Sequence, residues 1–189
     1  MLRAWVLTVL SAAMVTATMA VAHANETGPV KATLANSEFI LHVHAINAAE
    51  VQMGQVAEQH VLRGSTLALA VKMINDHTQL DGNLAKLAAQ EKLDLPVQLD
   101  AVHQTLINGL SNTPDAQFDA AYINAVVLEQ KQMISLLEAE DKREHTGPYQ
   151  TFVADALPIL RNHVILAEQA LVRLQTPEGF HASSSLTRP

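Results

Sequence analysis

Apolar residues recur at every third or fourth position through most of this chain, and this period constrains the fold more than any other feature. In the first such segment they are Phe39, Val43, Ile46, Met53 and Ala57. An α-helix turns once in 3.6 residues, so this spacing places the apolar side chains on one face. Four later segments share the pattern. We therefore predict five helices, at about residues 37–63, 66–92, 96–110, 114–144 and 148–175.

The breaks between these segments indicate a bundle. Residues that commonly end or begin helices separate the segments: Gly64-Ser65, Asp94-Leu95-Pro96, Asn112-Thr113-Pro114 and Thr146-Gly147-Pro148. Residues 93–114 can span roughly 30 Å at about 1.5 Å per residue, which is enough to run back along a bundle. The predicted fold class is all-α, a four-helix bundle with a short crossover helix between the second and third long helices.

Pro158 lies inside the last predicted helix. A proline in a helix interior lacks one hydrogen-bond donor and clashes with the preceding turn. We therefore expect a kink or a break near Leu157.

The N-terminus has the three parts of a secretory signal peptide. Arg3 is followed by an apolar stretch over residues 4–22, which ends in the small-residue pattern Ala22-His23-Ala24. We expect residues 1–24 to be removed and the protein to be exported to the periplasm. The alternative is a membrane anchor, since the stretch approaches the roughly 20 residues that a span requires. Residues 25–36 are then a linker, residues 37–175 the bundle, and residues 176–189 a serine-containing tail predicted to be disordered.

Composition excludes several classes of function. Arg3 is the only charged residue of the predicted signal, so its removal changes the formal net charge from −7 to −8. An acidic surface of this kind disfavours nucleic acid and anionic lipid as partners. The chain has no cysteine, which excludes disulfides and thiolate chemistry. We find no enzyme motif and no later segment that is apolar enough to span a membrane. Nothing in the sequence indicates a particular protein partner or an oligomer.

Polar residues interrupt three of the apolar stripes. Glu50 lies on the first stripe, His77 and Asp81 lie on the second, and His163 lies on the last. In the fourth helix the stripe passes through either position 129 or position 130. A buried carboxylate or imidazole is costly unless it is paired or ligated. These four residues are therefore candidate ligands of one transition-metal ion, and imidazole with carboxylate suits zinc, iron, manganese, nickel or copper. The alternative is that they pair with one another as core hydrogen bonds.

Several motifs, in order along the chain, resemble one bacterial family. They are Asn75-Asp76-His77-Thr78, Leu95-Pro96, Phe118-Asp119-Ala120-Ala121-Tyr122 and Leu157-Pro158-Ile159-Leu160-Arg161-Asn162-His163. The family is catalogued as domain of unknown function 4142, is often labelled "predicted outer membrane protein", and is placed in the ferritin-like superfamily. The resemblance covers about residues 33–174 and implies a ferritin-like bundle in the periplasm or envelope, with no established activity. By motif match, the family-typical positions are Glu50, His77, Asp119, Tyr122 and His163.

Two departures from these patterns bear on metal binding. Gln130 stands where the family tends to have a histidine, and an amide is a poor metal ligand. Di-iron members of the superfamily use two Glu-x-x-His motifs. The only such motif here is Glu178-Gly179-Phe180-His181, beyond the predicted bundle. The resemblance therefore implies neither di-iron chemistry nor iron storage.

The sequence leaves three hypotheses open. The first is a non-enzymatic bundle with a structural or interaction role in the bacterial envelope. It requires Glu50, His77, Asp81 and His163 to be apart, or paired with no cavity between them. The second is a protein that holds a single transition-metal ion in its core, with a redox role. It requires at least three ligand atoms within about 4–5 Å of one point. The third is a protein that binds a ligand in an apolar groove beside the short helix.

Overall fold

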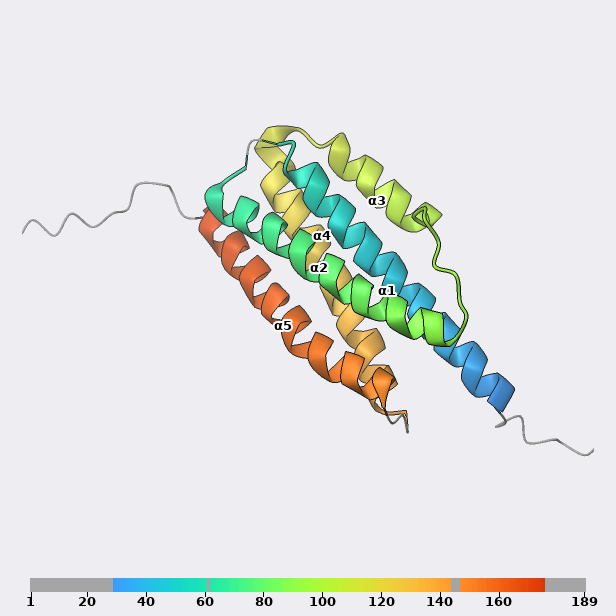
Figure 1. Cartoon of the computed structure of the whole chain (residues 1–189). Helices are drawn as coiled ribbons and strands as arrows, with labels where there is room; N and C mark the ends of the chain where they lie inside the picture. Colours follow the sequence, from blue (N-terminus) through green and yellow to red (C-terminus); the bar gives the residue numbers. More distant parts are fainter. Residues whose placement is uncertain (1–28, 61, 144–146, 176–189) are drawn as a thin grey trace, which may run out of the picture.

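The computed structural model describes residues 29–60, 62–143 and 147–175. The predicted signal peptide at 1–24, the first part of the predicted linker and the predicted tail at 176–189 lie outside these ranges. Within them the chain forms five α-helices and no strand, which confirms the predicted all-α fold (Figure 1). None of these helices is both long and apolar enough to cross a membrane.

The number and order of the helices match the prediction, but several boundaries differ. The helices are α1 (Pro29–Ala57), α2 (Gly64–Gln90), α3 (Ala101–Ser111), α4 (Asp115–Asp141) and α5 (Pro148–Gln175). Because α1 begins at Pro29, its first turns occupy part of the predicted linker. The start of α3 at Ala101 has a local cause: the Asp100 side chain accepts a hydrogen bond from the backbone N–H of His103 at 2.9 Å. An aspartate in this position caps the free amides of a first turn.

Helix α5 continues through Pro158 without interruption, so of the predicted kink or break the break is wrong, and the kink stays a prediction. The residues on either side explain why the helix is retained. Leu157 and Leu160 are both buried in the core. Tertiary packing of an apolar face supplies most of the stability of a helix in a protein, and here it outweighs the cost of one missing donor.

The four long helices form two pairs joined by a crossover (Figure 1). Helix α1 packs chiefly on α2, and α4 packs chiefly on α5. Contacts between α2 and α5 and between α1 and α4 close the bundle. Helix α3 lies on the crossover from α2 to α4, where it packs on α1 and touches α4. This is the crossover helix that the sequence predicts.

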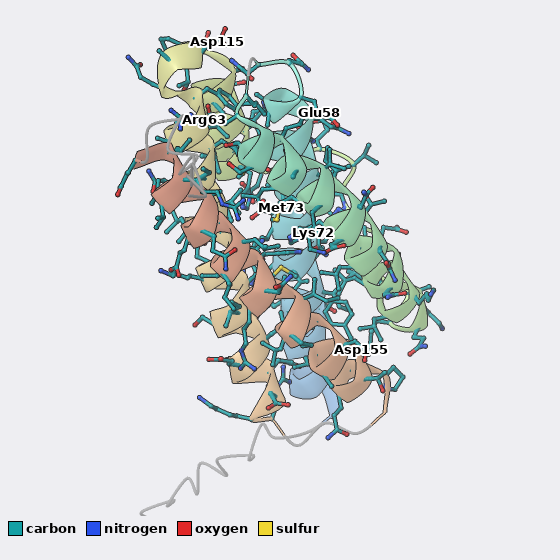
Figure 2. The ribbon with its side chains drawn as sticks, turned by 90° about the vertical axis from the view of Figure 1, so that its left-hand side faces the viewer. Glu58, Arg63, Lys72, Met73, Asp115 and Asp155 are labelled. Atoms are coloured by element: carbon teal, nitrogen blue, oxygen red, sulfur yellow. The ribbon has the colours of Figure 1, made fainter. Side chains whose placement is uncertain are left out.

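At one end of the bundle the α1–α2 connection meets the start of α4. Figure 2 shows Arg63 and Asp115 at this end and Asp155 toward the opposite end. His60 Nδ1 lies 2.6 Å from Asp115 Oδ1, and the backbone N–H of Arg63 donates to Asp119 Oδ1 at 3.3 Å. Asp119, a family-typical position, therefore joins the bundle end rather than the core.

Among the described residues the core consists of two apolar clusters, to each of which all four long helices contribute. The first cluster contains, among others, Ile40, Val43, Leu84, Leu137, Val153 and Leu160. The second contains, among others, Met53, Ala70, Met73, Phe118, Tyr122 and Ala167. Along each long helix the two clusters are successive, so a boundary between them crosses the whole bundle at mid-height.

Gly54 allows α1 and α2 to pack closely within the second cluster. A Cβ atom added at Gly54 would lie 2.5 Å from Ile74 Cγ1 and 3.1 Å from the carbonyl oxygen of Ala70. The backbone oxygen cannot yield easily, so the two helices would have to separate. By contrast, a Cβ atom at Gly82 in α2 would meet nothing within 4 Å.

These two glycines provide a matched test of the helix packing. We expect Gly54→Ala to destabilise the protein by about 1–3 kcal/mol through overpacking. We expect Gly82→Ala to stabilise it by roughly 0.5–1 kcal/mol, because alanine is the better residue in an open helix position. Urea unfolding of both variants measures the difference. Equal stability of Gly54→Ala and the unsubstituted protein would contradict the close α1–α2 packing.

Candidate functional site

A layer of polar side chains lies at the boundary between the two apolar clusters. It consists of Asn47 and Glu50 on α1, His77 on α2, Gln130 on α4 and His163 on α5, and each of these is 0% exposed. Each lies on its helix between residues of the first cluster and residues of the second. The helical period that buries their apolar neighbours therefore buries these residues as well. We call this set the polar layer.

The amide of Gln130 is the centre of the polar layer. Its Nε2 donates to Glu50 Oε1 at 2.9 Å and also lies 2.9 Å from His77 Nε2. Its Oε1 lies 3.1 Å from His163 Nδ1. One side chain of α4 thus contacts a polar side chain from each of the other three long helices.

These contacts fix the protonation of His77. An amide nitrogen only donates, so His77 Nε2 must accept from Gln130. His77 Nδ1 lies 2.9 Å from Asn47 Oδ1, which only accepts, so the single ring proton is on Nδ1. Burial and then the charge of the nearby His163 lower the pKa of His77 to about 3, although the charge of Asp76 opposes the shift. His77 is therefore neutral at neutral pH, as the hydrogen bonds require.

On the α2–α5 side, the polar layer extends to a partly exposed ion pair. His163 Nε2 lies 2.7 Å from Asp76 Oδ2, and Lys72 Nζ lies 2.8 Å from the same oxygen. Figure 2 shows Lys72 near the middle of α2. Burial lowers the pKa of His163, while the Asp76 carboxylate opposes that shift. Burial alone would raise the pKa of Asp76, but its bonds to Lys72 and His163 lower it overall. Asp76 is therefore the group that favours a proton on His163.

On the opposite side, the polar layer extends to the crossover segment. Asn47 Nδ2 donates to Asp81 Oδ1 at 3.4 Å, and His44 Nδ1 lies 2.8 Å from the same oxygen. The other ring nitrogen of His44, Nε2, lies 2.8 Å from the carbonyl oxygen of Pro96. A continuous series of polar contacts therefore crosses the bundle from Asp76 to the crossover.

Glu50 is the least satisfied member of the polar layer. Among the described residues its Oε2 has no hydrogen-bond partner, and the same is true of the buried hydroxyl of Tyr122. Burial raises the pKa of Glu50 well above its ordinary value; the bond from Gln130 opposes this, and the charge of Glu129 adds to it. Burial, and then the charge of Glu50, raise the pKa of Tyr122. Tyr122, a family-typical position, is thus an uncharged core residue.

Three of the four predicted ligands come together, and one does not. Glu50, His77 and His163 meet, but they meet at the Gln130 amide. Asp81 is 29% exposed at its side chain and contacts His44 and Asn47 outside the centre. Within the described part of the chain, no group of three or more histidine, aspartate or glutamate side chains has an arrangement that could hold a metal ion.

Sequence reasoning leaves one further member of the polar layer open and misses another. Gln130 is one of its two alternatives for the fourth stripe. The other, Glu129, is also buried but lies 3.4 Å from His103 on α3 rather than in the polar layer. Asn47 was not identified, although it precedes Glu50 by three residues and so shares its helix face.

The fold and this site define the class of the protein: an all-α helical bundle whose core contains a hydrogen-bonded polar layer. The sequence matches the family described as "Domain of unknown function (DUF4142)" over residues 19–170. This match spans most of the chain, so the protein belongs to that family. No curated protein and no solved structure matches the chain.

The raised pKa of Glu50 gives a test with a definite sign. The ordinary pKa of a glutamate is 4.5. Above this pH Glu50 is ionised in the unfolded chain but keeps its proton in the folded chain. The stability associated with this group is thus fully present below pH 4.5 and is lost as pH rises toward the folded pKa. We expect Glu50→Gln, which cannot titrate, to stabilise the protein more at pH 8 than at pH 5. Urea unfolding at both pH values measures this.

The matched control for this experiment is Glu138→Gln. Glu138 forms a surface ion pair with Arg161 at 2.9 Å, and both side chains are exposed. We expect Glu138→Gln to change the free energy of unfolding by less than about 1 kcal/mol at either pH, because exposed ion pairs contribute little to stability. An equal loss of stability at pH 5 and pH 8 in Glu50→Gln would mean that Glu50 is ionised in the folded protein.

Proposed function

We propose that this protein is an exported, non-enzymatic helical bundle with a structural or interaction role in the bacterial envelope. One observation carries the non-enzymatic part. The Gln130 amide lies 2.9 Å, 2.9 Å and 3.1 Å from atoms of Glu50, His77 and His163. The point at which these three side chains meet is thus filled by a side chain of the protein itself. A substrate or an ion would have to displace it.

In this proposal the polar layer sets the alignment of the helices. Its members bond to one another from all four long helices and lie between apolar clusters. A shift of one helix by a turn would place a polar group against apolar side chains without its partner. A buried polar group left without its hydrogen-bond partner destabilises the fold by about 1–3 kcal/mol. Buried polar groups that specify one alignment in this way are best known from coiled coils.

Export is supported by the order of charge, apolar stretch and small residues in the first 24 positions. The absence of cysteine is compatible with an oxidising compartment. The ferritin-like relationship is proposed on two grounds. One is the resemblance of the motifs, and the other is the crossover between α2 and α4, a connection that ferritin-like bundles share.

The alternative is a single transition-metal ion bound by Glu50, His77 and His163, with a redox role. The convergence of these residues from three helices favours it, as does Glu50 Oε2, for which the described part of the chain offers no hydrogen-bond partner. Carboxylate and imidazole are suitable ligands for such an ion. It requires the Gln130 amide to turn aside, because the amide nitrogen has no lone pair to offer.

Expression of the full chain, followed by purification from the periplasm, tests both the proposed export and the proposed absence of a metal cofactor. We expect a mature protein that begins at Asn25 and contains only trace transition metal by elemental analysis. His77→Ala should leave this metal content unchanged, and the exposed His42→Ala serves as the matched control. Retention in the cytoplasm with residues 1–24 intact would overturn export. A stoichiometric metal that is lost in His77→Ala but kept in His42→Ala would establish the alternative.

A further inference from the structure

Helix α3 is attached to the bundle unevenly along its length. In its second half Ile107 and Leu110 are buried in the second apolar cluster. In its first turn the buried side chain is His103, whereas Val102 is exposed. His103 is therefore the main buried contact of the first turn.

The imidazole of His103 lies between two carboxylates, one of which belongs to α4. Its Nε2 is 3.4 Å from Glu129 Oε2, and the Glu129 side chain is 6% exposed. Its Nδ1 is 2.8 Å from Oδ2 of Asp100, the residue that caps α3. An ionised carboxylate only accepts hydrogen bonds, so both ring nitrogens must carry a proton to face the two groups favourably. The arrangement therefore requires the charged form of His103.

The burial of Glu129 makes this ion pair important for the attachment of α3. Among the described residues Glu129 Oε2 has no hydrogen-bond partner, so the charge of His103 is what offsets it. A buried carboxylate that loses its counter-charge is strongly destabilising. Helix α3 otherwise packs on α1 and only touches α4.

The other charged or titratable groups beside His103 do not replace it. Lys131 of α4 and His42 of α1 share with His103 the lining of one groove. The Lys131 ammonium lies 3.8 Å from Glu168 Oε1 on α5. His42 is exposed. His103 is thus the basic side chain placed to pair with Glu129.

The shared groove has a volume of about 570 Å³ and lies between α1, α3 and α4, beside the first turn of α3. Its lining also includes the apolar side chains of Ile46 and Leu136. The sequence predicted an apolar groove beside the short helix, and the structure has one there. That this groove binds a ligand stays a prediction.

We propose that His103 is a pH-sensitive attachment of the crossover helix. When it is charged, it holds the first turn of α3 against Glu129. When it loses its proton as pH rises, that turn opens and the adjoining groove widens. This inference goes beyond the proposed structural role, because it adds a response to pH.

The electrostatics of the contact set the direction of this response. The Glu129 carboxylate raises the pKa of His103 above its ordinary value of 6.5, burial opposes the shift, and Asp100 raises the pKa further. A group whose pKa is raised by folding stabilises the fold below its unfolded pKa. The attachment is thus fully present below pH 6.5 and is lost as pH rises through the folded pKa of His103.

Two measurements on the purified protein test the inference together. NMR of the imidazole ring gives the titration midpoint of His103, which we expect to exceed 6.5. Hydrogen exchange at pH 5.5 and pH 9, corrected for the intrinsic rate at each pH, gives the protection of the amides of residues 103–106. For each unit by which the midpoint exceeds 6.5, this protection should fall about tenfold between the two pH values, because proton binding and opening are linked. The amides of residues 108–111, beside the buried Ile107 and Leu110, should change less.

One variant and two controls identify the partner. Glu129→Gln removes the buried charge and keeps the size of the side chain, so it should lower the His103 midpoint and reduce the change in protection. Glu138→Gln is the same substitution at an exposed position of the same helix, and it should leave both quantities unchanged. His42→Ala, which removes the exposed histidine of the groove, should also leave them unchanged.

Three results would overturn the inference: a His103 midpoint outside the range from 6.5 to about 9, an equal fall in protection at 103–106 and 108–111, or the same pH response in Glu129→Gln as in Glu138→Gln. The first two are measured on the unsubstituted protein, so they do not depend on the folding of any variant. None of them bears on export or metal content, which are tested separately.

Discussion

The hydrogen bonds of the Gln130 amide are the interaction on which the rest of this structure depends. An amide has donors on its nitrogen and an acceptor on its oxygen, and here the two ends serve different helices. The nitrogen contacts Glu50 and His77, and the oxygen contacts His163. A residue without both functions would leave at least one of these groups unpaired, and all of them are 0% exposed. The energetic penalty of an unpaired buried polar group is larger than the net gain from an ordinary hydrogen bond.

The polar layer also connects the core to the outside of the bundle. On one side it ends at Asp76 and Lys72, and on the other it reaches the Pro96 carbonyl through His44. The second connection holds the crossover segment against α1. A few residues later the Asp100 side chain caps α3 by accepting a hydrogen bond from the backbone N–H of His103. The position of α3 therefore follows from the path of the crossover, which in turn depends on contacts that begin in the core.

Much of the fold could be predicted from the sequence because helical periodicity is a local property. The five helices and the short crossover helix follow from the spacing of apolar residues. The boundaries were less predictable because single side chains determine them. Pro96 suggested a helix start, but the cap at Asp100 places it later. Pro158 suggested a break, but the buried Leu157 and Leu160 keep α5 continuous.

The candidate site was predictable only in part. The inward direction of Glu50, His77 and His163 follows from helix phase. Asp81 follows His77 by four residues and shares its face, yet it lies nearer the surface, where it contacts His44. The central role of Gln130 depends on the placement of three other helices around it. No spacing within one helix could have distinguished its environment from that of Glu129.

The tautomer of His77 is the most direct test of this account, because it reports which end of the Gln130 amide faces α2. Nitrogen-15 NMR of the imidazole side chains measures it. The structure predicts that His77 carries its proton on Nδ1, has a bare Nε2, and does not titrate between pH 5 and pH 8. A proton on His77 Nε2, or titration near the ordinary histidine pKa, would contradict the arrangement on which the polar layer rests.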